Sequence, residues 1–160
     1  MYVEHPFPAV YDEYSEILIL GSFPSVKSRE NSFFYGHSQN RFWKVIAAIF
    51  GDNVPKTILD KRNLLLKNHI ALWDVIKSCE IKGSYDNSIT HVTPNDLSPI
   101  LNKTQIHKII VNGKIAEKYY KKYIEPQIHR IAIYLPSTSS ANASWNLERL
   151  VSVWWNFIKT

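Results

Sequence analysis

Cysteine is scarce in this chain of 160 residues, in which Cys79 is the only one. A lone cysteine excludes an intramolecular disulfide, a zinc ribbon and a four-cysteine iron–sulfur cluster. Residues 1–14 lack a basic start followed by an apolar run, so no signal peptide is visible. No apolar stretch is long enough to cross a membrane. We therefore expect a soluble, cytoplasmic protein with no membrane partner.

Several catalytic and cofactor motifs are also missing. The chain has no Gly-x-Gly-x-x-Gly fingerprint, no phosphate-loop lysine motif, no His-Glu-x-x-His and no zinc-deaminase pattern. Its six histidines are scattered, and only His37 adjoins the candidate site described below. The sequence therefore predicts a protein that needs neither a metal ion nor an organic cofactor.

Apolar and aromatic side chains are abundant by contrast. They make up 45% and 13% of the chain, with five Trp and nine Tyr, which is typical of a globular protein and also suits stacking on nucleic-acid bases. The formal net charge is +5 and the isoelectric point is near 9.2. This excess of positive charge favours a polyanionic partner, above all nucleic acid. An ordinary basic surface explains the same charge equally well.

Short apolar runs alternate with segments of helical periodicity. Strands are expected at 16–20, 70–73, 108–111 and 130–135. Helices are expected at about 38–50 and 56–68, after Gly113, and at the C-terminal end. This alternation indicates an α/β fold, with a parallel sheet between layers of helices, in a single domain over 1–160.

The remaining segments are given simpler interpretations. Residues 1–15 are expected to be irregular and to cover an edge of the fold, and 78–91 to form a polar loop. Thr93 is expected to cap a short helix that has Pro94 at its first position. Ser38 is the expected N-cap of the helix at 38–50, which would place Asn40 in its first turn.

Small, polar or backbone-bending residues follow each expected strand. They occur at 21–25, 73–74, 112–113 and 135–138. Ligands of open α/β sheets bind beyond the carboxyl ends of the strands, so this edge is the expected place for a site.

Three segments then carry a resemblance to a known family. They are Gly-Ser-Phe-Pro-Ser at 21–25, Phe-Tyr-Gly-His-Ser-Gln-Asn-Arg-Phe-Trp at 34–43, and Leu-Pro-Ser-Thr-Ser-Ser-Ala-Asn at 135–142. In order and spacing, together with Asn-Gly-Lys-Ile-Ala at 112–116, they resemble the uracil-DNA glycosylase superfamily. The nearest match is its hypoxanthine (deoxyinosine) branch, often called family 6.

The resemblance implies a three-layer α/β/α sandwich around a four-stranded parallel sheet. It also implies an enzyme that flips a deaminated base, most readily hypoxanthine, out of double-stranded or single-stranded DNA. Hydrolysis of the N-glycosidic bond then leaves an abasic site in base excision repair. Such an enzyme can work as a monomer, and the resemblance calls for no metal and no cofactor.

The resemblance also suggests the residues of the site. Asn40 matches the catalytic Asn of the hypoxanthine branch. Base-binding roles are expected for Ser22, Phe23, Tyr35 and Asn112. DNA-binding roles are expected for Ser25, Ser137, Thr138, Ser139, Ser140 and Asn142. Simpler roles stay open: a core position for Tyr35, capping of the next helix by Asn112 and a solvated loop for the Ser/Thr run.

The sequence departs from the family pattern at three positions. Phe23 stands where many relatives have an Asn or Asp that positions the attacking water. Leu135 replaces a His or Asn at the start of the last motif, and Ser140 replaces an expected Pro. These changes argue against efficient uracil-type catalysis and favour the hypoxanthine branch or a weak enzyme.

Three other functions remain open from the sequence. One is a uracil or thymine mismatch glycosylase of the same superfamily. Another is a nucleic-acid-binding module on this fold with weak or no catalysis, an alternative that the Phe23 departure keeps open. The third is an enzyme of free nucleosides or nucleotides, whose binding would show little salt dependence. No lysine lies within 21–25, 34–43 or 135–142, and Lys27 only follows the first of these segments, so base removal without Schiff-base strand cleavage is expected.

Overall fold

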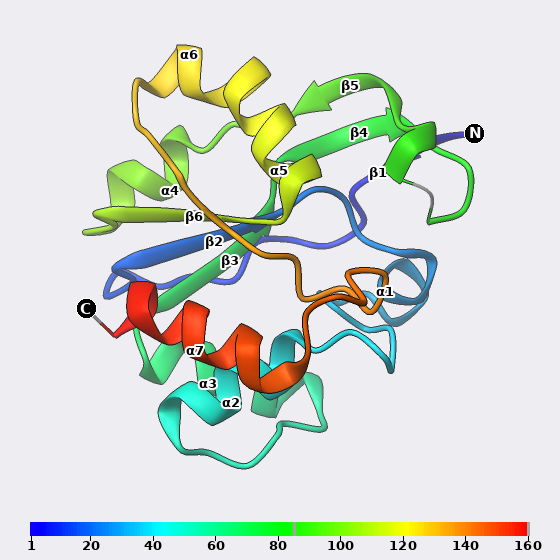
Figure 1. The fold of residues 1–160 in the computed structure, drawn as a ribbon. Helices are drawn as coiled ribbons and strands as arrows, with labels where there is room; N and C mark the ends of the chain where they lie inside the picture. Colours follow the sequence, from blue (N-terminus) through cyan, green and yellow to red (C-terminus); the bar gives the residue numbers. More distant parts are fainter. Residues whose placement is uncertain (85, 160) are drawn as a thin grey trace.

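The computed structural model describes residues 1–84 and 86–159, and its centre is a four-stranded parallel sheet (Figure 1). The strand order is β3-β2-β6-β7. The strands are β2 (Ile17–Gly21), β3 (Ile70–Asp74), β6 (Lys108–Asn112) and β7 (Ile133–Leu135). All neighbouring pairs are parallel, so the four carboxyl ends lie along one edge. The predicted sheet is therefore confirmed, although its last strand is shorter than 130–135.

Helices cover both faces of this sheet and complete the predicted three-layer α/β fold. One face carries α2 (Phe42–Phe50), α3 (Ile58–Lys67) and α7 (Leu147–Ile158). The other carries α4 (Ser98–Lys103), α5 (Lys114–Tyr119), the π-helical turn η2 (Tyr120–Ile124) and α6 (Glu125–Ile128). Among the described residues, no helix has the length and apolar character to span a membrane.

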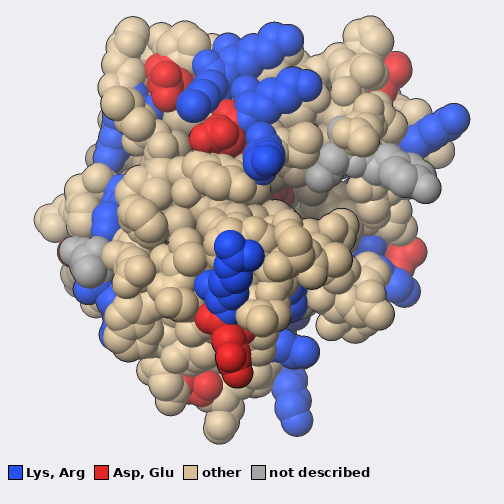
Figure 2. All heavy atoms as spheres, in the orientation of Figure 1, with Lys and Arg blue, Asp and Glu red and all other residues tan. Residues whose placement is uncertain are grey.

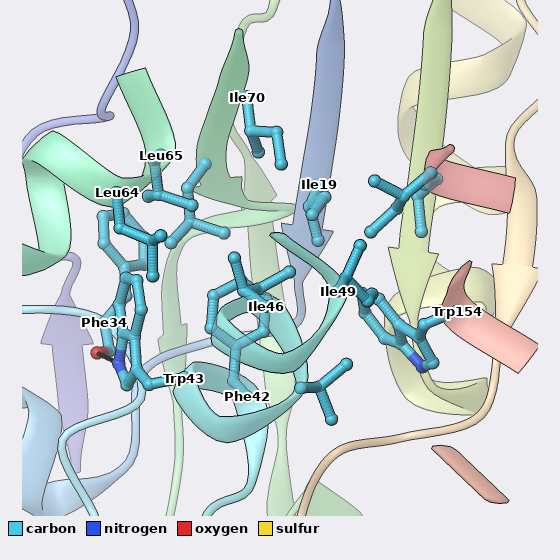
Figure 3. Packing of buried hydrophobic residues seen from close by; sticks show 14 of the residues in the cluster. Ile19, Phe34, Phe42, Trp43, Ile46, Ile49, Leu64, Leu65, Ile70 and Trp154 are labelled. Atoms are coloured by element: carbon cyan, nitrogen blue, oxygen red, sulfur yellow. Dashed lines mark hydrogen bonds between the residues drawn. The ribbon is translucent and has the colours of Figure 1, made fainter. Parts of the chain in front are cut away.

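The sheet has two buried faces because alternate residues of each strand point to opposite sides. Ile17 and Ile19 join the core under α2 and α7, whereas Leu18 and Leu20 join the core under α5. Figure 3 shows Ile19 beside Ile46 and Ile49 of α2, with Trp154 of α7 next to them. This packing fixes α2, whose N-terminus leads back to the candidate site.

A second sheet corrects three sequence-based predictions. Its strands, in the antiparallel order β1-β4-β5, are β1 (Tyr2–Glu4), β4 (Ile76–Glu80) and β5 (Thr90–Pro94). The prediction of a polar loop at 78–91 is wrong at both ends of that range, because β4 and β5 pair there. The short 3-10 helix η1 (Asp86–Ser88) lies between the two strands. Tyr85 is outside the described residues. Thr93 and Pro94 belong to β5 and start no helix. Residues 1–15 are not wholly irregular, because β1 pairs with β4.

The predicted N-cap at Ser38 is also wrong. Helix α2 begins at Phe42, and Arg41 is its N-cap without a side-chain capping bond. Asn40 lies before the helix, where its side-chain Oδ1 accepts a hydrogen bond from the Phe42 backbone N–H at 2.9 Å. An Asn two residues ahead of a free helical N–H satisfies that donor as effectively as a cap would. The remaining short helix, α1 (Val26–Asn31), follows β2 and is capped by Ser25.

Candidate active site

A cavity of about 600 Å³ opens at the edge of the central sheet where the parallel strands end. Figure 2 shows the surface hollowed below the Lys and Arg side chains that gather over α5 and η2. The structure brings every sequence-predicted site residue to this cavity; these residues are Ser22, Phe23, Ser25, Tyr35, Asn40, Asn112, Ser137, Thr138, Ser139, Ser140 and Asn142. Their placement together follows from the topology, because four chain segments converge on one edge.

A chain of hydrogen bonds runs along the wall of the cavity. Asn112 Nδ2 donates to Thr138 Oγ1 at 3.1 Å, and that hydroxyl donates to Asn40 Oδ1 at 3.0 Å. Asn112 Oδ1 accepts from the Thr138 backbone N–H at 3.1 Å. Thr138 is fully buried, so these bonds are shielded from water and hold their partners firmly.

This network determines which way the Asn40 amide faces. Its Oδ1 accepts from both Phe42 N–H and Thr138 Oγ1, which uses both lone pairs of the carbonyl oxygen. Among the residues that the structure describes, the Asn40 NH2 group has no hydrogen-bond partner. Asn40 therefore offers the cavity two N–H donors and no free acceptor.

Asn112 and Tyr35 are joined at the centre of the same wall. Asn112 Nδ2 donates to the Tyr35 hydroxyl at 3.1 Å, in addition to its bonds with Thr138. The alternative of helix capping by Asn112 is wrong, because the N-cap of α5 is Gly113 and no side chain caps it. Gly113 has a φ of +94°, and a Cβ there would lie 3.0 Å from Ser137 Cβ, so glycine lets the loop after β7 come close.

The Tyr35 ring is held between the core and the cavity. One face stacks on Phe42 with ring centroids 4.2 Å apart and planes at 20°. Tyr35 has a positive φ of 51°, which is uncommon for a bulky residue and indicates a position imposed by its surroundings. Burial, with a smaller contribution from the charge of Asp74, raises the pKa of the Tyr35 hydroxyl well above its ordinary value. The phenol therefore stays protonated and remains a donor at neutral pH.

Arg41 fixes the loop that follows β7. Its guanidinium donates to the backbone carbonyls of Ser139 at 2.8 Å, Asn142 at 3.2 Å and Trp145, while Nε donates to that of Thr138 at 3.3 Å. The sequence reasoning gave Arg41 no site role, although it lies inside the motif at 34–43. A planar fork of five donors is suited to gathering several carbonyls, so Arg41 shapes the loop from beneath.

The predicted DNA-binding residues mostly bond to one another within that loop. Ser139 N–H donates to Ser137 Oγ, Ala141 N–H donates to Ser139 Oγ, and Asn142 Nδ2 donates to the Ser137 carbonyl. Ser140 is exposed at the rim. The loop is therefore a compact turn with an exposed tip beside the cavity.

The turn after β2 forms the opposite wall. Phe23 is 8% exposed and lines the cavity with its ring, and the Arg29 guanidinium lies 5.7 Å from the centre of that ring. Ser22 lines the cavity as well, and its carbonyl accepts from Ile76 N–H. Ser25 Oγ accepts from Ser28 N–H as the N-cap of α1, so this hydroxyl already has a structural partner.

Asp74, which had no role in the sequence reasoning, lines the cavity, and His5 lies behind it. Asp74 ends β3 beside Gly21 in the register of the sheet and lines the cavity. His5 Nε2 lies 2.8 Å from Asp74 Oδ2, and both side chains are about 95% buried, at 4% and 5% exposure. His37 is thus not the only histidine near the site. The position of Asp74 after a strand was visible in the sequence, whereas nothing in the sequence placed His5 next to it.

The chemistry available to the cavity is donation and acceptance of hydrogen bonds by buried groups. Among residues 1–84 and 86–159, no group of three or more His, Cys, Asp or Glu side chains is placed to hold a metal ion. The cavity offers the Asn40 amide, the Tyr35 hydroxyl and backbone N–H groups as donors. It offers the Asp74 carboxylate as an acceptor and Phe23 as an apolar face. This set suits recognition of a flat heterocycle with polar edges.

Comparison with known proteins assigns the chain to a family. The model of the uracil DNA glycosylase superfamily matches residues 8–159. The chain belongs to this superfamily. The resemblance of the three motif segments is therefore confirmed, and the superfamily accounts for the sheet, the cavity and the loop after β7 together.

Individual relatives agree with this assignment. A hypoxanthine DNA glycosylase of Methanosarcina acetivorans is 36% identical over 152 residues, which cover 92% of this chain and 93% of the relative. One of Methanosarcina barkeri is 36% identical over 115 residues, covering 71% and 73%. The solution structure of a protein from Methanosarcina acetivorans, described as a candidate uracil DNA glycosylase, superposes with a TM-score of 0.83 at 34% identity. That match covers 99% of this chain and 97% of the other, and it confirms the fold.

Proposed function

We propose that the protein is a DNA repair glycosylase that flips a deaminated base, hypoxanthine first, out of DNA and hydrolyses its N-glycosidic bond. The observation that carries the proposal is the Asn40 amide, whose orientation is fixed by Phe42 and Thr138 and whose NH2 group is left for the cavity. The two curated relatives named as hypoxanthine DNA glycosylases support the choice of base.

The reaction determines what the cavity must supply. Breaking the bond between deoxyribose and base develops positive charge on the sugar and negative charge on the departing base. Donors fixed before the reaction stabilise such charge without a cost of reorganisation. The Asn40 NH2 group is a donor of this kind, directed at the leaving base or at the oxygen of the attacking water. An amide transfers no proton at neutral pH, so Asn40 acts by orientation and polarisation.

The other cavity residues position the flipped nucleotide. Phe23 supplies an apolar face for the base, and Tyr35 and Ser22 supply polar contacts at its edge. Asn112 has both amide hydrogens in use, on Tyr35 and Thr138, so its role is to hold these two groups in place. A base stacked on an aromatic ring gains about 1–3 kcal/mol, which helps to offset the cost of unstacking it from DNA.

DNA is held around the mouth of the cavity. Ser25, Ser137, Ser139 and Ser140 contact phosphates through their hydroxyls. The exposed tip of the loop at Ser140 enters the groove, and Thr138 and Asn142 keep the loop in shape. Lys114 lines the cavity as well, and basic residues on α5 and η2 extend the positive surface above it (Figure 2). A single chain provides every one of these groups, so the enzyme can work as a monomer. A cytoplasmic, DNA-associated location is part of this proposal.

The test uses two labelled DNA duplexes that differ only in one base, deoxyinosine or deoxyuridine, followed by alkaline cleavage at abasic sites. Preferential cleavage at deoxyinosine is expected. Cleavage mainly at deoxyuridine would move the protein to a uracil or mismatch glycosylase. Binding of both duplexes without cleavage would leave a DNA-binding module. Activity on free nucleosides with no preference for DNA would overturn the proposal altogether.

Strand cleavage by lyase chemistry is not expected. Lys27 is exposed and pairs with Glu30 at 3.5 Å, and Lys114 is the lysine among the residues lining the cavity. A lysine that attacked C1′ would form a Schiff base with the sugar. Borohydride should therefore trap no protein–DNA adduct, and an adduct lost on the substitution Lys114→Arg would contradict simple hydrolysis.

A further inference from the structure

Asp74 has one carboxylate oxygen bound and one free. Its Oδ2 lies 2.8 Å from His5 Nε2, and its backbone carbonyl accepts from Asn95 Nδ2 at 2.8 Å. Within the described residues, Oδ1 has no hydrogen-bond partner. The side chain is only 5% exposed, and Asp74 lines the cavity. Among the described residues, Asp74 Oδ1 is not one of the side-chain atoms that are both fully buried and unpartnered, so this oxygen is open to the cavity. A carboxylate oxygen in that position can accept a hydrogen bond from a ligand.

The free oxygen lies next to a free donor. A Cβ at position 21 would lie 2.5 Å from Asp74 Oδ1 and 2.9 Å from the Tyr35 hydroxyl, so both groups crowd the same point and Gly21 leaves room for them. The Tyr35 oxygen accepts from Asn112, and its own proton has no acceptor among the described residues. One end of the cavity thus presents an acceptor and a donor side by side.

Deamination of adenine to hypoxanthine changes the hydrogen-bonding groups at C6 and N1 of the purine, the edge that would face such an acceptor and donor. Adenine presents an amino donor at C6 and a bare acceptor at N1. Hypoxanthine presents a carbonyl acceptor at O6 and an N–H donor at N1. A carboxylate accepts hydrogen bonds only, so it attracts the N1–H of hypoxanthine and repels the lone pair of adenine N1. Guanine carries the same N1–H, so a carboxylate distinguishes hypoxanthine from adenine and not from guanine.

We propose that Asp74 is the residue that reads the deaminated edge of the flipped base. Asp74 Oδ1 accepts the N1–H of hypoxanthine while the Tyr35 hydroxyl donates to O6. His5 is a positioning residue, because it holds Oδ2 and leaves Oδ1 for the base. This inference rests on the proposed glycosylase function and adds to it the group that selects the substrate.

The order of contacts along the cavity wall separates Asp74 from Asn40. The chain of bonds from Asn40 through Thr138 and Asn112 reaches the Tyr35 hydroxyl, and Asp74 lies beyond it. In hypoxanthine the N1–H and O6 edge lies across the ring system from N9, which joins the sugar. A base with its glycosidic bond near Asn40 therefore directs this edge toward Asp74.

The test compares deoxyinosine with purine deoxyriboside, which lacks both O6 and the N1 proton, in the same duplex. Single-turnover release of each base is measured for the wild type, Asp74→Leu and Tyr35→Phe. Loss of a hydrogen bond to a charged group should slow release of hypoxanthine by about 10- to 100-fold in Asp74→Leu. Release of purine should change less than about 3-fold. Tyr35→Phe should show the same pattern with a smaller loss on deoxyinosine.

Comparing the loss of hypoxanthine release with the loss of purine release in Asp74→Leu separates the possible roles of Asp74. Equal loss on both substrates in Asp74→Leu would mean that Asp74 serves the chemistry or the structure, and it would overturn the proposal. Wild-type protein that released nothing from deoxyinosine would refute the proposed function itself. If Asp74→Leu fails to fold, wild-type protein should still bind free hypoxanthine more tightly than free purine, and equal binding would contradict the reading by Asp74.

Discussion

The two ends of the cavity differ in how their polar groups are satisfied. At one end, the Asn40 carbonyl and the Thr138 hydroxyl are saturated by protein partners, and only an NH2 group is left free. At the other end, Asp74 and Tyr35 each keep one group free, an acceptor and a donor. A donor fixed by saturated neighbours suits charge stabilisation, whereas an adjacent donor and acceptor suit recognition of a base edge. From this difference we propose that the first end serves catalysis and the second end serves selection of the base.

The largest effect should come from removing the donor at the catalytic end. Asn40→Ala loses the NH2 group and should slow hypoxanthine release by about 100- to 1000-fold, as for other fixed donors to a developing charge. The neighbouring Gln39, which is exposed and does not line the cavity, offers a matched control. Single-turnover kinetics should show near wild-type rates for Gln39→Ala. Equal rates for Asn40→Ala and wild type would move catalysis elsewhere.

The next effect concerns the loop that both ends share. Arg41→Ala removes donors from four backbone carbonyls of the loop after β7 and should destabilise the protein by about 2–3 kcal/mol. Urea unfolding measures this change. Arg62→Ala on α3 is the control, since Arg62 has no side-chain hydrogen bond within the described part of the chain. A loss no greater than that of the control would show that the loop holds its shape without Arg41.

Thr138 tests whether orientation matters at the catalytic end. Thr138→Val keeps the shape and removes the hydroxyl that donates to Asn40 Oδ1, so the amide can rotate. Hypoxanthine release should fall about 10-fold, the rate equivalent of roughly 1.4 kcal/mol. Thr138→Ser keeps the hydroxyl and should restore most of the rate. A rate in Thr138→Val equal to that of Thr138→Ser would mean that Asn40 needs no such support.

The smallest effect should come from the charge at the cavity mouth. Lys114→Ala should weaken DNA binding a few-fold and reduce the slope of log affinity against log salt by about 0.9, as expected for one lost phosphate contact. Lys103 ends α4 at the opposite edge of the sheet and is the control. Titrations by fluorescence anisotropy at several salt concentrations measure both slopes. An unchanged slope in Lys114→Ala would remove this lysine from the DNA-binding surface.

Sequence reasoning succeeded where a pattern was local. Continuous apolar runs such as 16–20 predict buried parallel strands, and the ends of these strands predict the edge that carries the cavity. The strands β4 and β5 were missed because their residues mix polar and apolar types, and β4 depends on pairing with β1 at the start of the chain. Their stability comes from partners distant in sequence, which local periodicity does not reveal.

For the site too, local sequence patterns were predictive and contacts between distant residues were not. The motif segments predicted which residues line the cavity, and the roles assigned to them remain predictions. The sequence did not reveal the orientation of Asn40, because it depends on a hydroxyl 98 positions away. It did not reveal the reading end either, because Asp74 depends on His5, 69 positions before it. Such contacts between distant side chains follow only from the three-dimensional fold.

The central claim is that the Asn40 amide lies at the reacting end of the flipped nucleotide, where it meets the leaving base or the attacking water. DNA containing 2′-fluoro-deoxyinosine serves as the probe, because the fluorine withdraws electrons from the sugar and blocks bond breaking. NMR of the 15N-labelled protein then follows the side-chain NH2 resonances of Asn40, identified by their absence in Asn40→Asp. We predict that they shift with this DNA and not with an undamaged duplex of the same sequence. Bound fluoro-deoxyinosine DNA with unchanged Asn40 resonances would contradict the account.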